Sequence, residues 1–329
     1  MFSRQMKIGI RAFIFVWILF FLSSCGQKSP GLQEGAISPD QILFENGTKY
    51  MDKGQVIKAR LTFQTLISSY PEGENTPSAF FAIADSYYKE AGREKLLHAE
   101  AQYKDFIIFY PLHEMADDAQ MKIVALNVRL MKSPDRDPSY AKRAEIELKN
   151  FLDNYPESEL ALTASEFLRQ VEENRAQSIQ GVGNFYFRKA SYLASESRYK
   201  EVITEYPNYS RLDVSLYRLG SSLESLGRIE EASVYYARVA AEFPFSVHSE
   251  DAEKKLILLE KPVPPIDVVA AERNKANQIE EEGFSLNPMK PIREVVDFFT
   301  GGEDVYEVAK RRAQEKAGDQ SEQITAREP

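Results

Sequence analysis

The stretch LFENGTKYMDKGQVIKARLTFQTLISSYP, residues 43–71, contains the pattern that decides the fold. It ends in an aromatic residue followed by proline, and the same kind of dipeptide closes four later stretches. The gaps between the five prolines are 40, 45, 51 and 37 residues, and the dipeptides are Tyr70-Pro71, Tyr110-Pro111, Tyr155-Pro156, Tyr206-Pro207 and Phe243-Pro244. A recurring period of this size is typical of a stack of similar units rather than of one globular core.

Counting back from each proline places apolar residues on one helical stripe. Small residues stand twelve positions before the prolines: Ala59, Ala99, Ala144, Ser195 and Ala232. Large residues stand eight positions before: Phe63, Tyr103, Leu148, Tyr199 and Tyr236. Apolar residues stand five positions before: Leu66, Phe106, Phe151, Val202 and Val239. These offsets are neighbours on one helix face. Each such helix is expected to stop at the proline, which lacks an N–H and clashes with the preceding turn.

A second helix is expected before each of these. The first unit carries Leu43, Gly47 and Tyr50 at helical spacing, and the last unit, residues 216–244 (LYRLGSSLESLGRIEEASVYYARVAAEFP), repeats the pattern. Both segments resemble the tetratricopeptide (TPR) consensus. In this consensus the first helix carries large, small and large residues, and the second carries small, aromatic and apolar residues before a proline. The middle units fit less closely on their first helices, which carry Ala84, Ala119 and Gly183. We therefore predict an all-α, TPR-like α-solenoid of about five helix-turn-helix repeats over residues 40–261.

The N-terminus has the pattern of a bacterial lipoprotein. Basic residues precede an apolar run at residues 12–22, which is too short to span a bilayer but suits a signal-peptide core. Leu22-Ser23-Ser24-Cys25 looks like a lipobox, and Cys25 is the only cysteine of the chain. We predict a signal peptide over residues 1–24 and lipidation of Cys25, with a plain signal peptide or short anchor as the alternative. Gly26 stands where an aspartate would retain the protein in the inner membrane, which favours the outer membrane.

The charge and composition fit a body on a tether. The net charge is −9, and removal of residues 1–24, which carry three basic and no acidic residues, leaves −12. That balance argues against nucleic acid or an anionic lipid surface as the main partner. Residues 25–39, rich in Gly, Pro and Ser, are expected to form a lipidated flexible tether. Asp40 is then the expected N-cap of the first helix.

Residues 262–329 are expected to form a partly disordered C-terminal extension. Prolines break the pattern after residue 261, and charged residues 266–282 are expected to be helical. An apolar patch follows, and it could dock on the solenoid or on a partner: Ile292, Val295, Val296, Phe298 and Phe299. A solvated extension is the favoured interpretation of this polar region, and a binding segment is the alternative.

No residue constellation points to catalysis. His98, His113 and His248 stand at unrelated repeat positions, and no two of these histidines stand at helical spacing. The sequence has no nucleophile elbow and no phosphate-binding glycine loop after a strand. We expect no enzyme activity, no metal and no cofactor.

The combination of a lipobox with these repeats resembles the outer-membrane assembly lipoprotein family BamD. The most similar segment is VGNFYFRKASYLASESRYKEVITEYP, residues 182–207, and the resemblance covers about residues 40–260. It implies a lipid-anchored subunit of the β-barrel assembly (BAM) complex on the periplasmic face of the outer membrane. The implied partners are the POTRA domains of a barrel-forming BamA-type protein, unfolded outer-membrane proteins and further assembly lipoproteins.

A candidate groove for a substrate peptide follows from the geometry of TPR repeats. First helices line the concave side, and its exposed positions are displaced by one residue from each core position. The predicted groove residues are Phe44, Thr48, Met51, Phe81, Asp85, Tyr88 and Gln120. An extended segment with alternating aromatic residues could place its side chains there. The alternative is that Phe44 and Phe81 pack against adjacent helices or the tail.

Two other classes of function stay open. The repeats serve equally well in a scaffold for another envelope process, such as peptidoglycan synthesis or secretion. An enzyme is the third class, and the missing nucleophile and base speak against it.

Overall fold

The computed structural model describes residues 38–90, 92–131, 134 and 136–284. The predicted signal peptide, Cys25, nearly all of the predicted tether and the apolar patch near residue 295 lie outside the described residues. Twelve helices and no strand occur in the described part of the chain. The prediction of an all-α, TPR-like solenoid is therefore confirmed.

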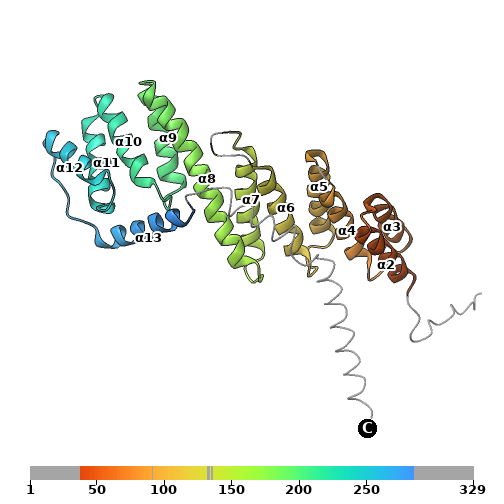
Figure 1. Cartoon of the computed structure of the whole chain (residues 1–329). Helices are drawn as coiled ribbons and strands as arrows, with labels where there is room; N and C mark the ends of the chain where they lie inside the picture. Colours follow the sequence, from red (N-terminus) through yellow and green to blue (C-terminus); the bar gives the residue numbers. More distant parts are fainter. Residues whose placement is uncertain (1–37, 91, 132–133, 135, 285–329) are drawn as a thin grey trace, which may run out of the picture.

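The helices follow one another as antiparallel pairs in an elongated row (Figure 1). Each first helix of a pair is followed by a second helix that ends at one of the aromatic-proline dipeptides. The first three pairs are α2 (Pro39–Asp52) with α3 (Val56–Ser69), α4 (Thr76–Lys89) with α5 (Arg93–Phe109), and α6 (Ala116–Leu130) with α7 (Ser139–Asn154). The last two pairs are α8 (Ala161–Arg188) with α9 (Tyr192–Glu205), and α10 (Leu212–Ser225) with α11 (Ile229–Glu242), followed by α12 (Ser249–Leu258) and α13 (Val268–Phe284).

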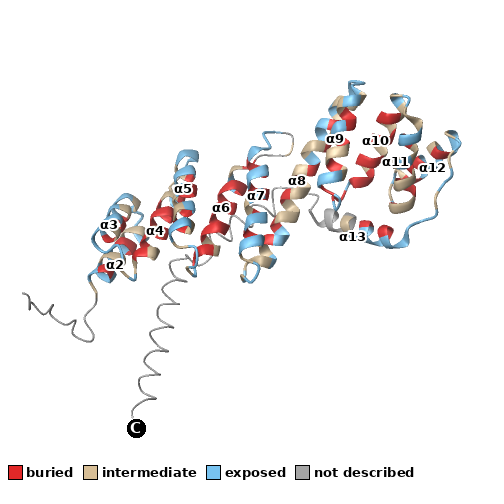
Figure 2. Cartoon of the chain, turned by 180° about the vertical axis from the view of Figure 1, so that it is seen from behind, coloured by how far each residue is buried: buried red, intermediate tan, exposed pale blue. Residues whose placement is uncertain are grey.

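The small, large and apolar stripe of the second helices forms the core. All fifteen residues at twelve, eight and five positions before the prolines have 0% relative exposure. Their burial is seen as red segments that face neighbouring helices in Figure 2. Each of these helices ends immediately before its aromatic-proline dipeptide, as the missing proline N–H predicts.

The start of the first helix differs from our expectation. Ser38, and not Asp40, is the N-cap, and its hydroxyl accepts the N–H of Gln41 at 3.4 Å. The Asp40 carboxylate accepts instead from the backbone N–H and the side-chain amide of Asn75, at 3.3 and 3.0 Å, in the turn before α4. Asp40 therefore joins the first repeat to the second, and Ser38 does the local capping.

The long helix α8 explains the widest gap between the prolines. It runs for 28 residues without a proline, packs on α7 and then continues as the first helix of the fourth pair. Gly183 lies where α8 packs on α9, since a Cβ on it would lie 2.8 Å from the ring of Tyr199. The extra residues thus extend one helix across two repeats.

The C-terminal extension begins with a helix that packs back on the solenoid. The helix predicted within 266–282 is confirmed as α13, which contacts α11. The N–H of Asp267 donates to the carbonyl of Ala241 at 3.0 Å, and the Asn274 amide donates to the carbonyl of Glu242 at 3.0 Å. These contacts satisfy carbonyl groups that the end of α11 leaves without helical partners.

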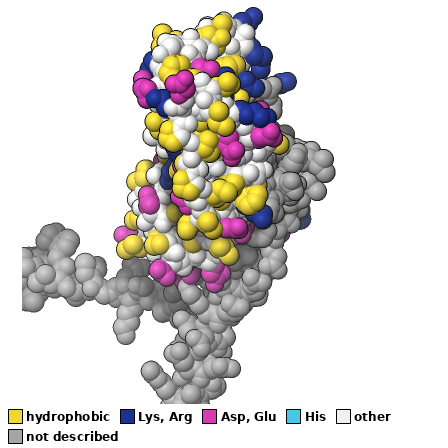
Figure 3. Space-filling view, turned by 90° about the vertical axis from the view of Figure 1, so that its left-hand side faces the viewer, with side chains coloured by type: hydrophobic (Ala, Val, Ile, Leu, Met, Phe, Trp, Pro, Cys, Tyr) yellow, Lys and Arg dark blue, Asp and Glu magenta, His cyan; other side chains and the backbone are white. Residues whose placement is uncertain are grey.

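The C-terminal end of the row exposes apolar side chains. Figure 3 shows them running down this end of the molecule between acidic and basic groups. Exposed apolar residues in α12 and in the turn before it are Phe245, Val247, Ile257 and Leu258, at 61%, 85%, 65% and 76% exposure. None of the described helices is long and apolar enough to cross a membrane.

Candidate peptide-binding groove

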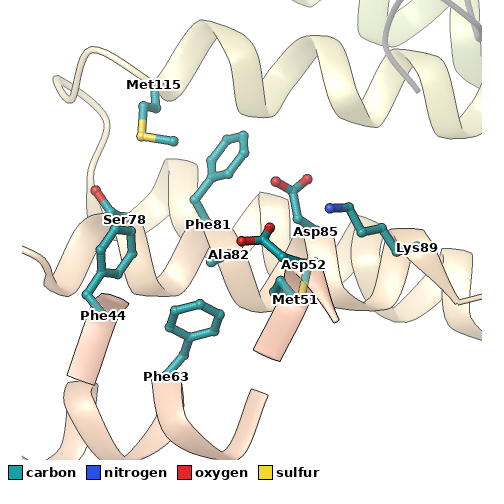
Figure 4. Close-up of a pocket in the computed structure, with 10 residues that line it drawn as sticks. All are labelled: Phe44, Met51, Asp52, Phe63, Ser78, Phe81, Ala82, Asp85, Lys89 and Met115. Atoms are coloured by element: carbon teal, nitrogen blue, oxygen red, sulfur yellow. The ribbon is translucent and has the colours of Figure 1, made fainter. Parts of the chain in front are cut away.

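A pocket opens where the first two repeats meet. Its cavity measures about 20 Å³, and its lining is mainly apolar. Figure 4 shows side chains from α2, α3 and α4 converging on it, with one from the segment before α6. The lining residues are Phe44, Met51, Asp52, Phe63, Ser78, Phe81, Ala82, Asp85, Lys89 and Met115.

Four of the seven predicted groove residues line this pocket. They are Phe44, Met51, Phe81 and Asp85, and they come from the facing helices α2 and α4. Phe44 and Met51 are half-buried, and the ring centroid of Phe44 lies 5.7 Å from that of Phe63. Displacing the core stripe by one residue therefore selects four side chains that meet at one pocket.

The expectation that Phe81 would point away from the core is wrong. Its side chain is 2% exposed, and its ring packs edge-on to Tyr103 and Phe106 at centroid distances of 5.3 and 5.4 Å. Packing against adjacent helices, the alternative considered for this residue, is what the structure has. The ring of Phe81 is therefore part of the hydrophobic core, and it also lines the pocket.

The other three predicted residues lie away from the pocket. Thr48 is buried and its hydroxyl donates to the carbonyl of Phe44 at 2.9 Å. Gln120 is buried and its amide donates to a carboxylate oxygen of Glu147 at 2.9 Å. Tyr88 is buried between α4 and α6, with the Lys122 ammonium 5.4 Å from its ring centroid, and burial raises the pKa of its hydroxyl. Gln120 and Tyr88 contact neighbouring helices and Thr48 bonds within its own helix, so none of the three is available on an open groove.

Polar groups stand on one side of the pocket. Figure 4 shows Asp52, Asp85 and Lys89 near its α4 side. Asp85 is buried, accepts a hydrogen bond from the hydroxyl of Tyr103 and lies 3.6 Å from the ammonium of Lys122. The pocket therefore combines an apolar lining with charged groups at one edge, the two kinds of group that ligand sites combine.

Sequence reasoning missed two of these polar groups. Asp52 and Lys89 lie one turn beyond Thr48 and Asp85 on the same helices, so extending the stripe by four residues would have included them. Within the described residues, no group of three or more His, Cys, Asp or Glu side chains could hold a metal ion.

Fold and pocket together define a helical-repeat protein of the tetratricopeptide type. The family profile described as outer membrane lipoprotein, YfiO, matches residues 37–237. The chain belongs to this family, which confirms the resemblance to BamD proteins stated from the sequence.

Relatives in several bacteria share one name, outer membrane protein assembly factor BamD. The outer membrane protein assembly factor BamD of Rickettsia prowazekii (strain Madrid E) is 25% identical, over 67% of this chain and 87% of the relative. The protein of the same name from Xylella fastidiosa (strain Temecula1) is 26% identical, over 57% of this chain and 67% of the relative. Among solved structures, the crystal structure of MamA protein covers 69% of this chain and 98% of its own, at 15% identity and a TM-score of 0.27.

Proposed function

We propose that this chain is a periplasm-facing, lipid-anchored subunit of the β-barrel assembly complex of the outer membrane. In this role it binds unfolded outer-membrane proteins and the POTRA domains of a BamA-type barrel-forming protein. Its membership of a family of outer membrane lipoproteins carries the proposal, because its relatives are described as outer membrane protein assembly factors. It acts by holding polypeptides, with no covalent step.

The pocket between the first two repeats is the proposed substrate site. Side chains alternate along an extended segment, so one apolar side chain can enter the pocket while its neighbours face away. Phe44 and Met51 are the half-buried apolar side chains at its mouth, and Asp52 and Lys89 supply charges at the edge. This arrangement suits the aromatic-rich C-terminal strand of a barrel protein.

The lipid on Cys25 is proposed from the sequence alone. Its cleavage site follows a basic and apolar leader of the length used by signal peptides. Mass spectrometry of the mature protein should find an N-terminal Cys25 carrying a diacylglycerol and an amide-linked acyl chain. An unmodified N-terminus at this position would contradict the anchor.

Affinity purification from solubilised membranes tests the assignment to the assembly complex. The tagged chain should recover a large barrel protein with POTRA domains. Recovery of only peptidoglycan-synthesis or secretion components would replace the proposal by the alternative scaffold.

A substitution at the pocket mouth tests the substrate site. Met51→Glu should weaken binding of a barrel protein's C-terminal peptide by about 5- to 30-fold, as loss of a buried apolar anchor does. Ile57→Glu is the matched control, because Ile57 lies in the same repeat, is 66% exposed and does not line the pocket. Equal affinities of the two variants, measured by fluorescence anisotropy, would remove the pocket from the binding site.

A further inference from the structure

A second, wider groove lies along α8, away from the pocket of the first two repeats. Its cavity measures about 780 Å³. One wall is the stretch of α8 from Gln177 to Tyr186, and the other walls are the segment before α7 and the residue that precedes α10. The proposed function places its substrate site in the first two repeats, so it leaves this groove without a role.

Hydrogen bonds fix the start of α10 against α8 and form this part of the groove. The side-chain amide of Gln180 donates to the carbonyl of Arg211 at 3.2 Å and to the hydroxyl of Ser215 at 2.9 Å. The amide oxygen of Gln180 accepts from the hydroxyl of Tyr209 at 3.2 Å. These bonds use the backbone of Arg211 and leave its side chain on the rim. A rim that is already ordered loses less conformational freedom when a ligand binds.

The α8 wall presents apolar side chains to solvent. Val182 and Phe185 stand three residues apart on one helix face, line the groove and are 43% and 48% exposed. Gly181 precedes Val182, and a Cβ built on it would meet nothing within 4 Å, whereas a Cβ on Gly183 would collide with Tyr199. Packing within the fold therefore requires Gly183 but not Gly181, although glycine weakens a helix interior. A glycine on an open wall lets the backbone of a bound segment approach closely.

The charged side chains that line the groove are arginines. Among the described residues, Arg136 and Arg211 line it and no carboxylate does. Both are exposed, and neither guanidinium has a hydrogen bond or ion pair with another described residue. The neighbouring carboxylates in the sequence, Asp137 and Asp213, each accept a hydrogen bond from a serine hydroxyl instead. In a chain of net charge −9, this groove therefore favours an acidic ligand.

Asn184 adds a hydrogen-bond donor to the α8 wall. It lines the groove, and its side-chain oxygen accepts from the hydroxyl of Tyr199 at 2.8 Å. This bond fixes the orientation of the amide, whose nitrogen has no hydrogen-bond partner among the described residues. The amide nitrogen can therefore donate to a backbone carbonyl of a bound peptide.

We propose that the α8 groove binds an extended, acidic segment of another protein. A large apolar side chain of that segment packs on Val182 and Phe185, its backbone passes over Gly181, and its carboxylates pair with Arg136 and Arg211. Successive side chains of an extended segment point to opposite sides, so the apolar ones can face α8 while the carboxylates face the arginines of the other walls. The groove is thus a partner-binding site separate from the pocket of the first two repeats.

Fluorescence anisotropy with synthetic peptides tests this site in the full chain, solubilised in detergent. The probe is a labelled peptide in which glutamate alternates with phenylalanine. Two comparison peptides alternate lysine with phenylalanine and glutamate with serine. The Glu-Phe peptide should bind about 10-fold more tightly than either, because only this peptide supplies both kinds of contact. Equal affinities for the three peptides would overturn the proposal.

Substitutions test whether the probe lies in the groove. Gly181→Leu adds a side chain to the open wall, at a Cβ position that meets no other atom within 4 Å, and should weaken Glu-Phe binding about 10-fold. Arg211→Glu should also weaken it, whereas Lys58→Glu, the same charge change at an exposed residue of α3, should not. Met51→Glu, at the pocket of the first two repeats, should leave this binding unchanged. Unchanged affinity in both Gly181→Leu and Arg211→Glu would overturn the proposal.

Reversing both arginines tests the charge preference. In Arg136→Glu with Arg211→Glu, the Lys-Phe peptide should bind more tightly than the Glu-Phe peptide. Both side chains are exposed, and circular dichroism verifies that each variant is folded. An unchanged order of affinities would contradict the assigned pairing. A dimer of the unmodified chain that Gly181→Leu dissociates, seen by sedimentation, would make the groove a contact between two copies and would overturn its assignment to another protein.

Discussion

At the scale of single residues, this fold depends on glycines that face aromatic rings. The ring of Phe63 lies where a Cβ on Gly47 would be, and Tyr199 and Tyr236 lie in the same way over Gly183 and Gly220. Each ring is fully buried and fills the space between the two helices of a pair. The absence of a side chain on the first helix therefore allows the large side chain on the second.

We expect Gly220→Ala and Gly181→Ala to have opposite effects on stability. Both place alanine inside a helix, so the gain in helix propensity is about the same for the two variants. Only Gly220→Ala adds a Cβ 2.8 Å from a buried ring carbon. The two free energies of unfolding should differ by about 1–3 kcal/mol, with Gly220→Ala the less stable. Urea titrations measure both values, and equal stabilities would contradict the packing described here.

Glu145 joins the third repeat to the fourth. Its buried carboxylate accepts from Lys149 at 2.7 Å, from Arg175 on α8 and from the hydroxyl of Tyr206 at 3.3 Å. Burial alone would raise the pKa of this carboxyl, but the hydrogen bond from Lys149 and the attraction of Arg175 outweigh it and hold the pKa below its usual value. The ionised form is therefore favoured in the folded protein.

This lowered pKa predicts a loss of stability in acid. The contribution of Glu145 is fully present above the ordinary value of 4.5 and is lost as the pH falls through the lower pKa of the folded state. Glu145→Gln should cost about 1–3 kcal/mol at pH 7, because it weakens hydrogen bonds to charged partners, and less at pH 3. Glu253→Gln, at an exposed position of α12, is the control. Urea unfolding at both pH values measures the difference, and a cost that does not depend on pH would argue against the mechanism.

At the scale of helices, the sequence predicts the second helix of each repeat better than the first. An aromatic-proline dipeptide stops a helix by local chemistry, and five second helices end there. The continuity of α8 depends on the absence of a breaker between Ala161 and Arg188, which a search for repeats does not test. The burial of Phe81 depends on rings contributed by α5, so the periodicity of its own helix cannot reveal it.

The position of α13 on α11 also cannot be predicted from the residue pattern of α13 alone. Its helical character follows from the sequence of 266–282, but its place on α11 depends on carbonyl groups at the end of another helix. The Asn274 side chain is buried in this contact and donates to the carbonyl of Glu242. One amide thus connects the extension to the fifth repeat.

We expect Asn274→Ala to loosen α13 without unfolding the solenoid. Loss of the hydrogen bond should cost about 1 kcal/mol and increase amide exchange in residues 268–277. Exchange in α10 and α11 should change little, because their apolar core remains. Glu272→Ala is the control, since Glu272 is exposed on the same helix. Hydrogen-exchange mass spectrometry makes the comparison, and equal exchange of α13 in the two variants would show that Asn274 does not hold it.

At the scale of the whole molecule, contacts run almost entirely between consecutive helices. Extensive contacts join every consecutive pair from α2 to α12, and smaller contacts join α2 with α4 and α11 with α13. Four separate core clusters lie along the row instead of one centre. Stability in such an array is approximately a sum of repeat terms and nearest-neighbour interface terms. The two ends of the molecule can therefore respond separately to a substitution or to a partner.

This arrangement predicts that a destabilising substitution at one end of the row lowers stability only in the repeats near that end. Phe63→Ala removes a fully buried ring from the first pair and should cost that region about 3–5 kcal/mol. Amide exchange should then accelerate in α2, α3 and their neighbour α4, while protection of α10, α11 and α12 is unchanged. The matched variant Tyr236→Ala, at the same repeat position of the last pair, should give the reverse pattern. Hydrogen exchange resolved by helix distinguishes local from global opening. Uniform acceleration across α2 to α12 in either variant would mean that the row unfolds as one cooperative unit, which contacts between consecutive helices alone do not explain.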